Sequence, residues 1–143
     1  MIIDCHVHVC GDTPGHGLVS PRLRKSLTFR FMRWRLGLTP ENGEAIERDV
    51  ESRLVETIAG TEGLEAAVVL AFDAVYDAEG RFDQANTHLY VTNDYVFELT
   101  RKHSKMLFGA SIHPYRKDAI SELERCVEPS LPGRAASRAL RVN

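Results

Sequence analysis

Two histidines near the amino terminus have the residue type and spacing that best suit chemistry. They lie in the segment Asp4-Cys5-His6-Val7-His8, in which apolar and polar residues alternate. Residues two apart in a β-strand project from the same face, about 7 Å apart along the chain, so the imidazoles of His6 and His8 could share one ion. Neutral imidazole is a ligand for zinc, iron, nickel and manganese, and geometry alone does not choose among them. The alternative is a surface or hydrogen-bonded pair of histidines.

Other polar residues near the ends of predicted strands are further candidates. His113 follows the third predicted strand, so we expect it on the same rim as His6 and His8. There it could contact substrate or lie behind a metal ligand. The alternative is a loop histidine that Pro114 positions. Asp73 ends the second strand, where a carboxylate commonly caps the next segment. Cys10 has the parity needed for a His-His-Cys set, but the following glycine favours a turn away from it. The remaining histidines have no spacing partner and are expected to be solvated: His16, His88 and His103.

The segments that would position these residues follow an α/β pattern. Strands are predicted from residue 2, over Ala66–Phe72 and over Met106–Ile112. Helices are predicted after each strand: from Thr39 and Pro40 to Gly60, over Thr92–Lys102 with Asn93 or Asp94 near its start, and from about Asp118. Their core faces are Ile46, Val50, Leu54 and Ile58; Tyr95, Val96 and Leu99; and Ile120, Leu123 and Val127. The order βαβαβα predicts a parallel sheet with right-handed crossovers, and the apolar run 66–72 predicts a strand covered on both faces.

These motifs resemble those of a known enzyme family. The opening segment, Ile-Ile-Asp-Cys-His-Val-His at 2–8, is similar to the first strand of the amidohydrolase superfamily of metal-dependent barrels. Residues 92–95, 108–116 and 122–126 resemble its amidohydrolase-related branch, which includes hydrolases and nonoxidative decarboxylases. The likeness runs from residue 1 to about Val127. It implies the first three βα units of a (β/α)8 TIM barrel, with His6 and His8 as ligands of a divalent metal, zinc by preference, and a small-molecule substrate.

The resemblance covers only part of such a barrel. A complete barrel has eight strands and about 250 residues, and the family's remaining ligands come from its later strands. We therefore expect residues 1–127 to be the N-terminal portion of a metal-dependent hydrolase barrel that is inactive alone. Residues 128–143 are expected to be an irregular or disordered tail, as after a truncation or a change of reading frame. The alternative is a nonenzymatic remnant that binds metal weakly or self-associates through its open sheet edge.

Composition argues against several classes of partner. The chain has 143 residues, and its 18 basic and 20 acidic residues give a formal net charge of -2, so we expect neither nucleic acid nor membrane as a partner. The longest apolar run is too short to span a bilayer, and an acid at position 4 excludes a secretory signal. Three cysteines form a sparse, odd set that suits a reducing compartment. These observations predict a cytoplasmic protein.

A cationic segment interrupts this balanced composition. Six basic residues and no acid occur between Ser20 and Leu38, interleaved with aromatic residues. The pattern superficially resembles a nucleic-acid or membrane-surface segment. In a barrel it would lie over the mouth of the active site, where arginines could attract a carboxylate-bearing substrate. The favoured interpretation is a solvated helix that Phe31 and Trp34 anchor to the protein.

Overall fold

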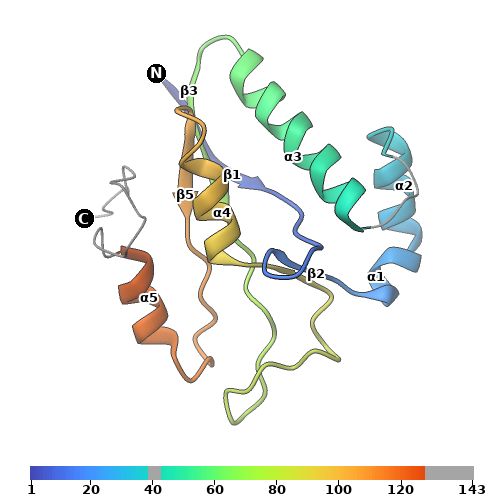
Figure 1. Cartoon of the computed structure of the whole chain (residues 1–143), viewed down its shortest axis with the longest axis vertical. Helices are drawn as coiled ribbons and strands as arrows, with labels where there is room; N and C mark the ends of the chain where they lie inside the picture. Colours follow the sequence, from blue (N-terminus) through green and yellow to red (C-terminus); the bar gives the residue numbers. More distant parts are fainter. Residues whose placement is uncertain (39–42, 128–143) are drawn as a thin grey trace.

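The chain folds as a mixed α/β structure around a three-stranded parallel sheet. The computed structural model describes residues 1–38 and 43–127. The strands are β1 (Ile2–His8), β3 (Leu64–Leu70) and β5 (Met106–Gly109), in the order β1-β3-β5 (Figure 1). Within the described residues the sheet is open and does not close into a barrel. The predicted cap at residues 39 and 40 and the predicted tail at 128–143 lie outside the described residues.

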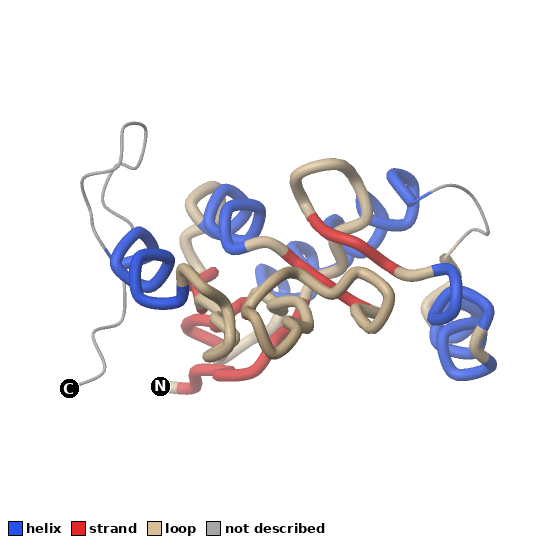
Figure 2. Tube along the Cα trace, turned by 90° about the horizontal axis from the view of Figure 1, so that it is seen from below, coloured by secondary structure: helices blue, strands red, loops and turns tan. Residues whose placement is uncertain are grey.

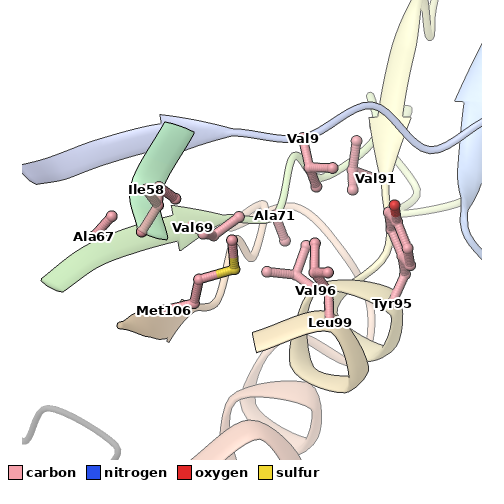
Figure 3. Packing of buried hydrophobic residues seen from close by; sticks show 10 residues of the cluster. All are labelled: Val9, Ile58, Ala67, Val69, Ala71, Val91, Tyr95, Val96, Leu99 and Met106. Carbon is pink, nitrogen blue, oxygen red and sulfur yellow. The ribbon is translucent and has the colours of Figure 1, made fainter. Parts of the chain in front are cut away.

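A helix follows each strand of this sheet, as predicted. These helices are α3 (Gly43–Gly60), α4 (Asn93–Thr100) and α5 (Ala119–Val127). Ile58 of α3 and Leu99 of α4 belong to the same buried cluster as Val69 of β3, so α3 and α4 pack on one face of the sheet (Figure 3). The other members of the cluster are Val9, Ala67, Ala71, Val91, Tyr95, Val96 and Met106.

The opposite face of the sheet is open. Val69 is fully buried, whereas Val68 and Leu70 are only partly buried and Phe72 is 43% exposed. The prediction that the 66–72 run is covered on both faces is therefore wrong for the described residues. Every second residue of the run contacts α3 and α4. Within the described residues, no layer of structure lies over the remaining residues of the run.

A second, antiparallel pair of strands was absent from the sequence predictions. β2 (Gly17–Val19) pairs with β4 (Leu89–Val91), and Gly17 lies opposite Val91. A Cβ atom at Gly17 would come within 2.1 Å of the carbonyl oxygen of Tyr90, so this position requires glycine. Each strand has three residues, too few for an alternating pattern to reveal them. The pair ties the loop after β1 to the segment before α4.

The cationic segment forms two short helices at the outer edge of the molecule. These are α1 (Pro21–Lys25) and α2 (Leu27–Arg35), and Figures 1 and 2 show them beyond α3, at the opposite end from α5. Serine caps begin both: Ser20 accepts from the N–H of Leu23, and Ser26 accepts from the N–H of Phe29. The expected anchoring is wrong, because Phe31 and Trp34 are 59% and 74% exposed.

The apolar face of α5 also differs from its prediction. Ile120, Leu123 and Val127 occur at core spacing, yet they are 71%, 49% and 53% exposed. Polar contacts hold this helix instead: Glu122 is buried, and its carboxylate accepts from the side-chain amide of Asn93 at 2.8 Å. The buried side of α5 is thus its polar side.

No helix within residues 1–38 and 43–127 combines the length and the apolar content that crossing a bilayer requires.

Candidate functional site

The histidine pair lies at the carboxyl end of β1, on the open face of the sheet. Val7 and Val9 pack toward the buried cluster, so the alternate residues His6 and His8 project to the other side. His8 is paired in register with Leu70 of β3. Its ring lies edge-on to that of Phe72, with the centroids 5.7 Å apart. Both histidines are exposed.

The two imidazoles converge on each other. Their Nε2 atoms are 3.1 Å apart, and the rings meet at 82° with centroids 4.8 Å apart. Two imidazole nitrogens bound at about 2.0–2.1 Å to one tetrahedral ion would be about 3.3 Å apart. The observed separation therefore fits ligands of one shared ion. Without an ion, the same contact is a hydrogen bond in which one neutral ring donates and the other accepts.

The backbone around His6 is fixed by a carboxylate. Asp4 Oδ1 accepts a hydrogen bond from the backbone N–H of His6 at 3.0 Å. The pairing of β1 with β3 shifts register between Asp4 and Val7, so the strand is irregular at the first histidine. This irregularity and the Asp4 contact together set how His6 faces His8.

The pair supplies two ligands, and the surrounding described residues add no third. Among residues 1–38 and 43–127, no group of three or more His, Cys, Asp or Glu side chains could hold a metal ion. Cys10 lies beyond the end of β1, and burial raises the pKa of its thiol to about 11, with further contributions from the carboxylates of Asp12 and Glu47. Within the described residues, Cys10 does not join the two histidines in a three-ligand group.

A buried carboxylate anchors the loop that follows β1. Glu47 of α3 is 6% exposed and accepts hydrogen bonds from the backbone N–H groups of Asp12 at 2.7 Å and Thr13 at 2.9 Å. His16 Nδ1 lies 2.5 Å from Glu47 Oε1, and its ring stacks on Tyr95 at 4.2 Å. The prediction that His16 is solvated without a partner is wrong, since residues far apart in sequence supply both contacts. Asp12 also pairs with Arg24.

Asp73 organises a second loop cluster, at the ends of β3 and β5. Its Oδ2 accepts from the backbone N–H of His113 at 2.7 Å and from the Arg116 guanidinium at 3.3 Å. Its Oδ1 accepts from the N–H of Ala74 at 2.8 Å and from the Tyr76 hydroxyl at 3.0 Å. Burial, together with the Asp73 carboxylate, raises the pKa of Tyr76, so its hydroxyl remains a donor. Asp73 is thus more than a local cap, because it connects the segments after two strands.

His113 lies in a loop, four residues beyond the end of β5. Its Nδ1 accepts from the backbone N–H of Tyr115 at 3.1 Å, so the neutral ring carries its proton on Nε2. Its ring contacts those of Tyr76 and Tyr115, with centroids 5.5 and 5.4 Å away. The residue is half-buried.

A buried amide connects β5, α4 and α5. Thr92 caps α4 by accepting from the N–H of Tyr95, and Asn93 and Asp94 are the first residues of the helix, near its start as predicted. Asn93 is therefore released for tertiary contacts: its Oδ1 accepts from the N–H of Ser111, and its Nδ2 donates to Glu122. Sequence reasoning missed Asn93, Glu47 and Glu122 as organising residues. The available signal for Glu47 was its position directly after Ala45 and Ile46 on the buried side of α3.

The two other histidines expected in solvent also have neighbours. His88 is half-buried, and its Nδ1 lies 3.2 Å from the Ser20 hydroxyl. His103, with Lys102 and Lys105, lines a cavity of about 270 Å³ beside the amino end of β5. This cavity is at the other end of the strands from the histidine pair, so His103 takes no part in that site.

Comparison with protein-family models, with curated proteins and with solved structures found no match to this chain.

Proposed function

We propose that the chain supplies the metal-binding strand of an amidohydrolase-related, metal-dependent enzyme. The observation that carries the proposal is the 3.1 Å separation of the His6 and His8 Nε2 atoms at the carboxyl end of β1. The arrangement around the pair supports it. Three parallel strands, each followed by a helix, have the order expected of the first three βα units of the proposed (β/α)8 TIM barrel, and active sites in such barrels lie at the carboxyl ends of the strands.

His6 and His8 would hold a divalent cation, zinc by preference, since their Nε2 atoms lie 3.1 Å apart. When bound, such an ion polarises a carbonyl or carboxylate and lowers the pKa of a bound water. The chain's own residues orient the ligands: Asp4 fixes the backbone of His6, and Phe72 shields one side of His8. The substrate class is a small molecule with an amide, ester or carboxylate, for hydrolysis or decarboxylation.

His113 is the proposed substrate-side residue. Asp73 holds its backbone, and its Nδ1 is occupied by the N–H of Tyr115, so Nε2–H is the donor left to the ring. A ring N–H donor at the ends of the strands suits a carbonyl or carboxylate oxygen. Its role is to bind and orient substrate.

We propose that the chain by itself has no catalytic activity. Catalytic zinc sites take three protein ligands, whereas this pair supplies two. We therefore expect weak metal binding and no turnover. A nonenzymatic, self-associating domain is the second candidate, and the observation that favours it is the exposure of the outer strand β1, where Ile2 is 61% exposed.

Calorimetric titration with zinc tests the proposal. The parent chain should bind weakly, and the His6→Ala/His8→Ala double variant should lose at least about tenfold in affinity, since a site's affinity depends on its ligand count. The matched control is His103→Ala, which removes a half-buried histidine away from the pair and should leave binding unchanged. Equal zinc affinity in the double variant and the parent would refute the assignment.

Activity assays test the second part. Amide, ester and carboxylic acid substrates should show no turnover with the zinc-loaded chain. Turnover that disappears in the His6→Ala variant would contradict this expectation and would imply that an oligomer completes the site.

A further inference from the structure

The solvent-facing side of α2 carries an apolar stripe. Leu27, Phe31 and Trp34 occur at helical spacing i, i+4 and i+7, and they are 80%, 59% and 74% exposed. Phe29, on the other side of the helix, is half-buried. An amphipathic surface helix normally turns its apolar stripe toward the core. In α2 the larger apolar side chains face outward.

Cationic side chains flank this stripe. Arg30 and Arg35 lie on either side of it at helical spacing, and both are exposed. Arg22 and Lys25 of α1 are exposed as well. Arg24 is excluded from this set because it pairs with Asp12. No acidic residue occurs between positions 20 and 38, so α1 and α2 contribute no negative charge to this surface.

We propose that α1 and α2 form a docking surface for an anionic lipid bilayer. Leu27, Phe31 and Trp34 would enter the boundary between headgroups and acyl chains, while Arg30 and Arg35 contact lipid phosphates. Tryptophan and phenylalanine on one side of a helix with arginine around them are typical of helices that lie in the plane of a membrane interface. The helices lie at the outer edge of the molecule, where a flat surface can approach them (Figures 1 and 2).

The net charge of -2 does not oppose this docking. Attraction to anionic lipid falls off within a Debye length of about 10 Å, so the charge near the surface decides the outcome. The expectation of no membrane partner depended on the total charge and on anchored aromatic side chains, and the structure shows those side chains in solvent.

Two other occupants are less favoured. A second copy of the chain, related by a twofold axis through the stripe, would bring Arg30 and Arg35 toward the same cations of its partner. A nucleic acid would use the cations and stack on Trp34, but it would leave Leu27 without an apolar environment. An anionic bilayer satisfies the charge and the apolar side chains together.

Fluorescence of the full chain tests the proposal directly, because Trp34 is its only tryptophan. Vesicles of phosphatidylcholine with phosphatidylserine should shift its emission to the blue, and brominated acyl chains in those vesicles should quench it. Vesicles of phosphatidylcholine alone should do neither. Raising the salt concentration should weaken binding to the anionic vesicles.

Matched variants separate the contributions of charge and apolar contact. Arg30→Gln/Arg35→Gln should weaken vesicle binding about 30-fold, whereas the control Lys102→Gln/Lys117→Gln, with the same change in net charge on exposed residues, should not change it. Leu27→Ser/Phe31→Ser should abolish quenching, whereas Ile120→Ser/Leu123→Ser on α5 should preserve it. His6→Ala/His8→Ala should bind vesicles like the parent, because this proposal is independent of the metal site. All these side chains are exposed, and circular dichroism verifies that the variants fold.

Several outcomes would overturn the proposal. These are an unchanged Trp34 emission, equal binding to neutral and anionic vesicles, or equal losses in the arginine and lysine variants. Binding of an oligonucleotide without vesicle quenching would identify a nucleic-acid surface. Self-association lost in Phe31→Ser, without vesicle binding, would identify an interface between copies.

Discussion

The imidazole of His16 stacks on Tyr95 while its Nδ1 lies 2.5 Å from the carboxylate of Glu47. This contact joins the loop after β1 to α3 and α4. The loop begins directly after His8, so Glu47 stabilises the approach to the candidate metal site without touching it. The first two predictions concern the carboxylate of Glu47 and the buried carboxylate of Glu122.

Replacing Glu47 should destabilise the fold. Glu47→Gln keeps the size of the side chain but removes the charge that accepts from Asp12, Thr13 and His16, at a cost of about 1–3 kcal/mol. The control is Glu56→Gln, on the exposed side of α3, which should change the free energy of unfolding by less than about 0.5 kcal/mol. Urea unfolding measures both. Equal effects of the two variants would show that the hydrogen bonds to Glu47 contribute nothing measurable.

Stability should fall in acid because two buried carboxylates have lowered pKa values. Burial opposes ionisation of Glu47, but hydrogen bonds from Asp12, His16 and Thr13 outweigh it and lower its pKa. Hydrogen bonds from Arg125 and Asn93 likewise lower the pKa of Glu122.

The sign of this effect follows from proton linkage. As the pH falls, the two carboxylates are protonated first in the unfolded chain, at about pH 4.3. Their contribution to the free energy of unfolding is therefore fully present above that pH. It is lost as the pH falls through the lower pKa values of the folded state. Urea unfolding between pH 7 and pH 3 should show the decline. Glu47→Gln and Glu122→Gln should each make it shallower, and an unchanged slope in both would contradict the prediction.

Truncation of Asn93 should lower the free energy of unfolding more than truncation of Asn86. Asn93→Ala removes a buried amide that bonds Ser111 and Glu122, so unfolding should become easier by about 1–3 kcal/mol. Asn86→Ala removes an exposed amide that bonds only its local neighbour Asp83, and it should have a small effect. Similar thermal midpoints for the two variants would argue against a connecting role for Asn93.

The cysteines should differ in reactivity. With a pKa of about 11, on the order of one thousandth of Cys10 is thiolate at pH 8, and the side chain is partly buried. Cys5 is exposed. Mass spectrometry after brief treatment with iodoacetamide should therefore find Cys5 modified before Cys10. The reverse order would mean that the loop after β1 opens readily.

The open sheet should drive self-association. β1 and β5 have unpaired outer edges among the described strands, and an exposed apolar edge is a template for pairing. We expect sedimentation to show oligomers that Ile2→Lys reduces, whereas Gln84→Lys, which adds the same charge to an exposed loop position, should not. A monomer with a sharp thermal transition and no dye binding would show that three βα units form a self-sufficient domain.

Local patterns were enough to predict the order of the main elements. The alternation near the amino terminus and the four-residue repeat of α3 each depend on neighbours in sequence. The predicted strand is confirmed, since β1 begins at Ile2, and the predicted helix is confirmed as α3, with Ile46 and Ile58 buried. The same periodicity failed for α5, because an apolar stripe specifies a face that must be covered but not what covers it. Leu123 was expected to be buried, but no element within the described residues covers it.

The contacts around the candidate site were less predictable. Alternation predicted that His6 and His8 share a face, and the structure adds their 3.1 Å approach. Glu47, which pairs with His16, and Arg116, which pairs with Asp73, are 31 and 43 positions away in the chain, and no local pattern reports such pairs. The pairing of β2 with β4 was missed for the same reason.

The pairing of β2 with β4 has a consequence for how the protein forms during synthesis. Residues 17–19 leave the ribosome long before residues 89–91, their hydrogen-bonding partners. β1 likewise remains unpaired until β3 has been synthesised. The strand that bears the histidines therefore stays without its β3 partner until residues 64–70 have been translated. Closing these large loops has an entropic cost that later contacts must repay, so we expect chaperones to meet this segment while it is still unpaired.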